Sequence, residues 1–422
     1  MTFIDRPVIV KRIRDALAEY PVTLLLGPRQ CGKTTIARAF HKANGGTYFD
    51  LEDPETPLKP EIAKQVLKEL KGLIVIDEFQ GQPELLPLVR VLVDREDNPA
   101  RFLILGSASI KGAHVAPSTG IKPRPTVVGA SATPSARTSS LESTELVRWV
   151  FESLAGRVAY VDMGGFSMDE VGADGSDDLW IRGGFPNSFL ARNDDQSYQW
   201  RLNFIASFLE RDIPQLGIRV PAYALRRFCV MVAHHHGNIW NAADLGRAMG
   251  TKEDTARKYL DILSGSYMVR QLPPWFSNTG KRLVKAPKVF IRDSGVLHAL
   301  LGLKDRMQIH SHPKLGPSWE GFAIEQIILI TGAEKDAYFY KTHGGAELDL
   351  LIMRGGKQYG FEFKYSDAPK VTKAMHVVFN DLDLEKLWVV YPGEKSYPLD
   401  EGIDVVPLKS CRAEMRQMIG DG

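Results

Sequence analysis

The sequence predicts an α/β protein that begins with a parallel sheet covered by helices on both faces. Three observations predict this fold class. Short apolar runs alternate with helical patterns, a glycine-rich loop follows the first apolar run, and a continuous apolar run at 73–76 ends in two carboxylates. Such alternation favours parallel strands, because each parallel connection must cross back over the sheet, usually as a helix.

The elements of this first sheet follow one another at regular spacing. Each expected strand is short and apolar, and ligands of such a sheet bind beyond the carboxyl ends of its strands. The expected strands are 22–26, 47–50, 73–76, 102–105 and 158–162, and the expected helices are 33–41, 61–70 and 84–93.

The length of the chain, 422 residues, exceeds one ordinary core and favours about three domains. The first sheet defines a domain over 1–165, within which 110–142 is rich in Pro, Ser, Thr, Ala and Gly and is expected to be a flexible insertion. We expect a lid or helical linker over 166–222, a winged-helix-like region over 223–300 and a small α/β domain over 301–422.

The loop after the first strand has the pattern G-x-x-x-x-G-K-[ST], which predicts the phosphate-binding loop of a P-loop NTPase. Gly27 and Gly32 permit backbone angles that turn amide N–H groups towards an anion. Lys33 supplies a charge for the outer phosphates, and Thr34 offers a hydroxyl to Mg²⁺. The helix that starts here adds its positive dipole end. The expected nucleotide-binding residues are Gly27, Pro28, Arg29, Gln30, Cys31, Gly32, Lys33, Thr34 and Thr35.

Two acids and two further residues complete the expected nucleotide site. Asp77 is expected to hold hydrated Mg²⁺, and Glu78 to polarise the attacking water. Ser107, at the end of the fourth strand, is a candidate sensor of the terminal phosphate, with a turn serine as the alternative. Arg157 is a candidate to stabilise phosphate charge in cis or from a neighbouring subunit, with a surface arginine as the alternative.

The expected winged-helix-like region contains two short helices, 241–250 and 251–263, and strand-like runs at 267–271 and 288–291. This order is typical of a helix-turn-helix with wing strands. The second helix mixes acidic and basic side chains, so DNA contact is one hypothesis and a protein-packing element is the other. Basic residues form a local patch near the wing: Lys281, Arg282, Lys285, Lys288 and Arg292.

A second candidate active site lies in the C-terminal part. Strand-like runs carry Asp349, Glu362 and Lys364 after a helix at 319–331. Period-two alternation places Glu362 and Lys364 on one face of their strand. Asp349 and Glu362 would hold a divalent metal while Lys364 steadies an attacking water, the arrangement that cuts a phosphodiester. The pattern is short, so a fold relic or an exposed pair of charged strands is the alternative.

Composition restricts the class of protein less than the motifs do. Lys and Arg number 53 against 51 Asp and Glu, and the resulting net charge of +2 argues neither for nor against nucleic acid. Cys31, Cys229 and Cys411 lack metal-binding spacing and fit a reducing compartment. The chain shows no signal-peptide pattern and no membrane-length apolar run, so we expect a cytoplasmic protein without membrane contact.

Several motifs together resemble a large bacterial and archaeal family of AAA-type ATPases whose second half is a domain of unknown function. The resemblance covers nearly the whole chain. In this chain 110–142 separates motifs that the family usually places close together. The motifs are 27–35, Ile76-Asp77-Glu78, Gly106-Ser107, 153–157, 182–186, Lys281-Arg282 and 362–364.

The resemblance implies a P-loop ATPase module, a winged helix and a restriction-nuclease-like fold. It implies nucleotide contacts at 27–35, metal support from Asp77, catalysis by Glu78 and a sensor role for Ser107. We therefore expect an ATP- and Mg²⁺-dependent hydrolase whose C-terminal half binds DNA or a protein client, with a homo-oligomer as a further expectation. The alternatives are an ATP-regulated, metal-dependent DNA endonuclease and a nucleotide-gated binding module without hydrolysis.

Overall fold

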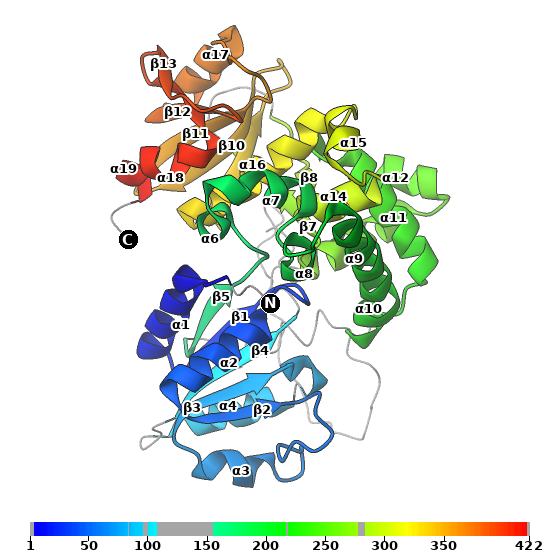
Figure 1. Cartoon of the computed structure of the whole chain (residues 1–422), viewed down its shortest axis with the longest axis vertical. Helices are drawn as coiled ribbons and strands as arrows, with labels where there is room; N and C mark the ends of the chain where they lie inside the picture. The colour runs from blue at the N-terminus through cyan, green and yellow to red at the C-terminus, as the bar shows by residue number, and fades with distance from the viewer. Residues whose placement is uncertain are drawn as a thin grey trace, which may run out of the picture.

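A computed structural model describes residues 4–82, 84–95, 100–107, 154, 156–216, 218–276 and 283–419. The expected insertion at 110–142 and the basic residues Lys281 and Arg282 lie outside these ranges. In Figure 1 the first sheet lies in the lower half of the molecule, a second sheet lies at the upper left, and a group of helices lies between and to the right.

The first sheet is parallel throughout, with strand order β2-β3-β4-β1-β5, and this confirms the predicted α/β class. Leu25 of β1 faces the helices α1 and α2, whereas Leu24 and Leu26 face α3 and α4, so helices cover both faces. The elements are α1 (Pro7–Glu19), β1 (Val22–Leu26), α2 (Lys33–Asn44), β2 (Thr47–Asp50), α3 (Ala63–Glu69), β3 (Gly72–Asp77), α4 (Leu85–Val93), β4 (Ala100–Gly106) and β5 (Val158–Asp162).

The segment after β5 is helical and crosses the carboxyl edge of the first sheet. Its longest helix, α9, continues into a π-helix, η4, and a π-helical turn of this kind often marks a functional position. The elements are α6 (Met168–Val171), α7 (Ser176–Arg182), α8 (Pro186–Phe189), α9 (Asp194–Ser207), η4 (Phe208–Asp212) and α10 (Ile213–Gln215).

The next region contains the two helices and two strands predicted for it. Its antiparallel sheet has the order β6-β8-β7. Its core is continuous with the core between the first sheet and α1, so these regions pack as neighbours. The elements are α11 (Ala222–His235), β6 (Asn238–Ile239), α12 (Ala242–Met249), α13 (Glu253–Gly265), β7 (Val269–Leu272), β8 (Lys288–Ile291), α14 (Ser294–Leu300) and α15 (Arg306–His310).

The C-terminal region forms a mixed sheet with the order β13-β14-β12-β11-β10-β9. Helix α16 packs against one face and α17 against the other. Most of α16 is buried, because it is apolar around its whole circumference. The elements are α16 (Leu315–Thr331), β9 (Ala337–Lys341), β10 (Glu347–Arg354), β11 (Lys357–Phe363), α17 (Lys373–Asp381), β12 (Lys386–Tyr391), β13 (Tyr397–Asp400), β14 (Ile403–Pro407), α18 (Cys411–Glu414) and α19 (Arg416–Ile419).

Within the described ranges, none of the helices combines the length and the apolar character that crossing a bilayer would need.

Candidate nucleotide-binding site and C-terminal acidic cleft

The predicted phosphate loop connects β1 to α2 at the carboxyl edge of the first sheet. Gly32 has a φ of 99°, a left-handed conformation that favours glycine, and it directly precedes α2. No side chain of the described part caps this helix, so its first N–H groups are available to an anion. The Lys33 ammonium is buried and donates to the carbonyls of Gly27 (3.0 Å) and Pro28 (2.8 Å). Thr34 is half-buried on the first turn of α2, and Thr35 is exposed.

Asp77 ends β3 beside this loop, and both of its carboxylate oxygens are fixed. The Tyr48 hydroxyl, from β2, donates to Oδ2 at 2.6 Å, and the Glu78 backbone N–H donates to Oδ1 at 3.0 Å. Burial and the neighbouring Asp77 raise the pKa of Tyr48 well above its ordinary value, so the phenol remains a donor. No sequence motif marked Tyr48 as part of this site.

Glu78 has the properties expected of a base. Its φ of 54° is in the left-handed region, and such conformations occur often at functional sites. Burial raises the pKa of Glu78, and the positive charges of Lys33 and Arg29 partly oppose this effect. The Gln80 amide donates to its carboxylate. Asp77 and Glu78 therefore point to different environments, as their separate expected roles require.

Arg29 connects the phosphate loop to the helical segment above it. Its Nη1 donates to Asp212 Oδ1 at 2.9 Å, and its Nη2 donates to Glu52 Oε1 at 3.2 Å and lies 3.9 Å from Glu78 Oε2. Asp212 ends the π-helix η4 and also accepts from Arg211 Nε at 3.1 Å. The sequence predicted Arg29 as a loop residue but gave no signal for these partners, which lie far away along the chain.

Arg6 connects the phosphate loop to the segment after β5 and was not predicted. Its guanidinium is buried, donates to the Cys31 carbonyl at 3.3 Å and to the Gly164 carbonyl at 3.0 Å, and forms an ion pair with Glu170. The Cys31 thiol donates to the Met163 carbonyl at 3.5 Å. Cys31 therefore faces the segment after β5, where it packs in the protein interior.

Ser107 and Arg157 have different positions relative to this site. Ser107 follows β4, which lies between β1 and β3, and its Oγ is buried with no hydrogen-bond partner in the described part of the chain. Arg157 precedes β5: its carbonyl accepts from Val22 N, and its side chain pairs with Asp94. Because Val22 begins β1 and the phosphate loop follows its end, roughly 15 Å separate these two edges. Within a single chain, Ser107 therefore lies at the same edge of the sheet as the phosphate loop, whereas Arg157 lies at the opposite edge.

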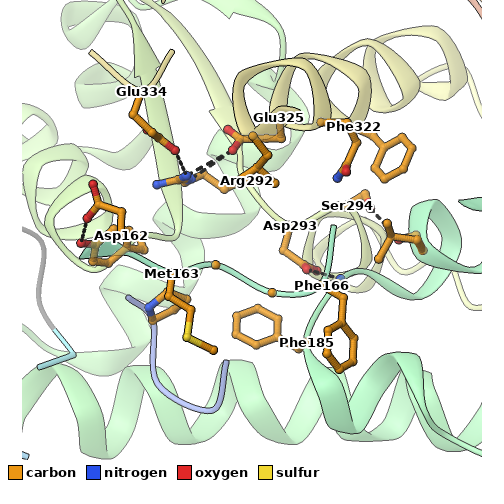
Figure 2. A pocket seen from close by; sticks show the side chains of 18 residues that line it. Asp162, Met163, Phe166, Phe185, Arg292, Asp293, Ser294, Phe322, Glu325 and Glu334 are labelled. Carbon is orange, nitrogen blue, oxygen red and sulfur yellow. Dashed lines mark hydrogen bonds and ion pairs between the residues drawn. The ribbon is translucent and has the colours of Figure 1, made fainter. Parts of the chain in front are cut away.

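A small cavity of about 80 Å³ lies where the phosphate loop, the β5–α6 connection, β8 and α16 meet. Figure 2 shows Arg292 between the carboxylates of Glu325 and Glu334, with N–O distances of 3.2 and 3.1 Å. Asp162, at the end of β5, accepts from the Tyr267 hydroxyl at 2.7 Å. Charged side chains from both halves of the molecule thus line a cavity that the phosphate loop also lines.

The C-terminal acidic cleft, of about 910 Å³, contains the second set of predicted residues. Asp349 of β10, Glu362 of β11 and Lys364 lie together as predicted, with 2.9 Å between Lys364 Nζ and Glu362 Oε2. Glu320 of α16 and Glu347 of β10 also line this cleft and were not predicted as ligands. Burial and the neighbouring Asp349 raise the pKa values of Glu320 and Glu362.

A lysine from the neighbouring region reaches into this cleft. The Lys288 ammonium, on β8, lies 2.7 Å from Glu347 Oε1, 3.3 Å from Asp349 Oδ1 and 3.6 Å from Glu320 Oε1. Among the described residues, no set of three or more His, Cys, Asp or Glu side chains is arranged to hold a metal ion. The predicted ligands Asp349 and Glu362 therefore come together in this structure, but they do not fit a metal as arranged.

The basic patch predicted near the wing is wrong in two of its members. Lys288 is buried among carboxylates, and the partly buried Arg292 is paired with Glu325 and Glu334, so both charges are compensated within the protein. Lys285 is exposed. The reason lies in the tertiary structure. The acids that pair with these two residues come from the C-terminal region, and the sequence near Lys288 and Arg292 does not reveal this contact.

Comparison with known proteins finds three family profiles that match successive parts of the chain. A family profile described as an AAA domain matches residues 19–119, and two described as domains of unknown function, DUF8612 and DUF4143, match 173–307 and 315–411. "Uncharacterized protein Rv2008c" of Mycobacterium tuberculosis and "Uncharacterized protein Mb2031c" of Mycobacterium bovis are 43% identical over 404 residues, 96% of this chain and 84% of each relative.

Two solved structures show more distant similarity. The Walker-type ATPase PABY2304 of Pyrococcus abyssi has a TM-score of 0.45 at 16% identity and covers 71% of this chain and 96% of its own. RuvB of Thermotoga maritima has a TM-score of 0.29 at 13% identity and covers 64% and 91%. At TM-scores below 0.5, neither structure bears on how this chain works.

The parallel sheet, the phosphate loop and the AAA-domain match define the first half as an AAA-type P-loop domain of the ATP-binding class. The chain belongs to the same family as the mycobacterial proteins Rv2008c and Mb2031c. Its second half consists of the two regions that match domains of unknown function.

Proposed function

We propose that the protein is a Mg²⁺-dependent ATPase that couples ATP hydrolysis to its C-terminal half. One observation carries the proposal: two acids in different environments, Asp77 and Glu78, lie at the carboxyl end of β3 near the phosphate loop. Asp77 is fixed by Tyr48 and by a backbone N–H, which suits a metal-supporting role. Glu78 is a partly buried carboxyl with a raised pKa, which suits a general base.

The other members of the site fit this assignment. Lys33 and the N–H groups at the start of α2 would bind the phosphates, and Thr34 with Asp77 would support Mg²⁺. Within the described part of the chain, the buried Ser107 hydroxyl has no hydrogen-bond partner, and a phosphate oxygen would supply one. Bound Mg²⁺ would neutralise charge on the transferring phosphate.

Two substitutions test the proposal. Lys33→Ala should abolish ATP binding, whereas Glu78→Gln should retain binding and lower turnover by about 10²- to 10⁴-fold, the usual contribution of a general base. Lys42→Ala, an exposed change at the other end of α2, is the matched control and should leave both unchanged. Full turnover by Lys33→Ala and Glu78→Gln would refute the proposal. Tight ATP binding without turnover in the native protein would favour a nucleotide-gated binding module.

The partner of the C-terminal half is DNA or a protein client. The element order α11-β6-α12-α13-β7-β8 and the sheet order β6-β8-β7 support a winged-helix-like region. On α13, however, Arg257 is paired with Glu253 on the surface, which leaves little free positive charge for phosphates. ATPase activity measured with and without duplex DNA separates the hypotheses: stimulation favours DNA, and no response favours a protein client.

In a homo-oligomer, Arg157 could stabilise the phosphates of a nucleotide bound to a neighbouring copy, which it does not reach within its own chain. Because Arg157 lies at the edge of the sheet opposite the phosphate loop, it would reach a nucleotide only in a second copy. Specific ATPase activity should then rise with protein concentration in the native chain and not in Arg157→Ala. Activity that is independent of concentration would remove Arg157 from the mechanism.

A metal-dependent nuclease is a second candidate function for the C-terminal region. The observation that favours it is the convergence of Glu320, Asp349, Glu362 and Lys364 in one cleft, on a helix and two neighbouring strands. Incubation of the chain with plasmid and Mn²⁺ tests it. Cleavage that survives both Asp349→Ala and Glu362→Ala would not come from this cleft.

A further inference from the structure

We infer that Lys288 is a built-in counter-cation that occupies the cation position of the C-terminal acidic cleft, so that a divalent metal and the Lys288 ammonium compete for the same carboxylates. The inference deepens the second candidate function and rests on it for the biological purpose of the metal. It explains why the predicted ligands meet in one cleft and yet do not fit a metal as arranged.

The position of the ammonium supports this inference. Lys288 belongs to β8, in a different region from the carboxylates that it contacts, and its side chain is only 5% exposed. Its Nζ lies 2.7, 3.3 and 3.6 Å from Glu347, Asp349 and Glu320, which come from a strand and a helix. An ammonium has three donors, so it can serve several carboxylates at once, as a metal ion does.

Lys288 is the ammonium of this cleft that is shared among several carboxylates. Among the described residues, four carboxylates (Glu320, Glu347, Asp349, Glu362) lie with three ammonium groups (Lys288, Lys341, Lys364). Lys341 pairs with Glu347, and Lys364 pairs with Glu362. Withdrawal of the Lys288 ammonium would leave Glu347 and Asp349 without the cation that lies 2.7 and 3.3 Å from them, and a divalent ion at the same position would replace it.

Glu320 shows that the Lys288 ammonium does not provide a hydrogen bond to every carboxylate of the cleft. Its Oε1 is buried and has no hydrogen-bond partner in the described part of the chain, and the Lys288 Nζ at 3.6 Å is too distant to donate to it. A buried carboxylate oxygen without a donor is costly. A hard cation placed between Glu320 and Asp349 would satisfy this oxygen, because carboxylate oxygens are the preferred ligands of such ions.

The ammonium can leave without a change of fold. The backbone of Lys288 is held in the sheet by pairing with Ile239 and Leu272. The neighbouring chain is also tied to β9, where Trp275 N donates to the Phe339 carbonyl. The two regions therefore stay together, while the flexible four-carbon stem of lysine lets the ammonium move away from these carboxylates within the open cleft.

Mn²⁺ binding by the full chain tests the inference, measured by loss of the free-ion EPR signal. Lys288→Met keeps the stem and removes the charge, and it should bind Mn²⁺ at least about tenfold more tightly than the native chain. Lys341→Met is the matched control, because it removes an ammonium that pairs with Glu347 at the half-exposed rim. It should change the affinity by less than about threefold. Addition of Glu362→Gln to Lys288→Met should abolish the gain.

Equal Mn²⁺ affinity in Lys288→Met and the native chain, or an equal gain in Lys341→Met, would overturn the inference. Because Lys288→Met leaves buried carboxylates uncompensated, a second pair of variants covers a failure to fold. Lys288→Met combined with Glu347→Gln should bind Mn²⁺ at least about tenfold more tightly than Glu347→Gln alone. No difference between these two would also overturn it.

Failure of this inference can be distinguished from failure of the ATPase proposal and of the nuclease proposal. ATP turnover by Lys288→Met reports on the ATPase independently, because Lys288 forms its ion pairs with carboxylates of the C-terminal acidic cleft. If Lys288→Met binds Mn²⁺ tightly and does not cut plasmid, the nuclease hypothesis fails while the competition between Lys288 and metal stands.

Discussion

Tyr48→Phe separates metal support from nucleotide binding at the proposed ATP site. The change removes only the hydroxyl that donates to Asp77 Oδ2 at 2.6 Å, and the Glu78 N–H still holds Oδ1. A hydrogen bond to a charged group contributes about 1.5–3 kcal/mol. Tyr48 is half-buried, so water can replace part of the lost bond and the lower limit applies. Because 1.4 kcal/mol is a factor of ten, the Kd for Mg²⁺–ATP should rise about tenfold.

The assay compares ATP affinity with Mg²⁺ and with EDTA. If Tyr48 acts through Asp77 on the metal, the loss should appear with Mg²⁺, and the Kd in EDTA should stay within about twofold of the native value. Tyr160→Phe, on β5 at the opposite side of the same sheet, is the matched control. An equal loss of affinity in both conditions, or no loss with Mg²⁺, would refute the role given to Asp77.

Three further predictions concern pH, stability and thiol reactivity. Because burial raises the pKa of Glu78, turnover at saturating Mg²⁺–ATP should fall at a higher pH on acidification than an ordinary glutamate would give, and Glu78→Gln should lack this limb of its pH profile. Arg270→Met should lower the unfolding free energy by about 3 kcal/mol in urea, because Glu325 and Glu334 lose a buried partner, whereas Arg257→Met at an exposed pair should cost less than about 0.5 kcal/mol. Burial raises the pKa of Cys229 to about 12, so the native chain should react with Ellman's reagent far more slowly than the urea-unfolded chain.

The first sheet could be predicted closely because each of its strands is a local apolar run. β1 (Val22–Leu26) and β2 (Thr47–Asp50) coincide with the predicted ranges. The edge strand β13 was not predicted. Only its alternate residues are partly buried, and it is stabilised by pairing with β14, a contact that local periodicity does not encode. Helix α1 was also not identified, although Ile9, Ile13 and Leu17 show the spacing of a helix with one buried face.

The residues of the candidate site could be predicted where they belong to short contiguous sequence motifs. Lys33, Asp77 and Glu78 belong to motifs whose strand context fixes their place at the carboxyl edge of the sheet. The partner of Arg29 could not be predicted in this way. Asp212 is 183 residues away and lies on a π-helical turn, for which the sequence has no periodic signal.

Lys288 and Arg292 show why a cluster of basic residues in the sequence does not by itself predict a basic surface. Both were assigned to a basic surface because Lys281, Arg282 and Lys285 lie close to them in the sequence. A charged side chain is buried only when a partner compensates it, and here the partners come from α16, from the turn after it and from β10. Asp349 is 61 residues from Lys288. The same burial that removes Lys288 from a nucleic-acid surface places its ammonium among the carboxylates of the C-terminal acidic cleft.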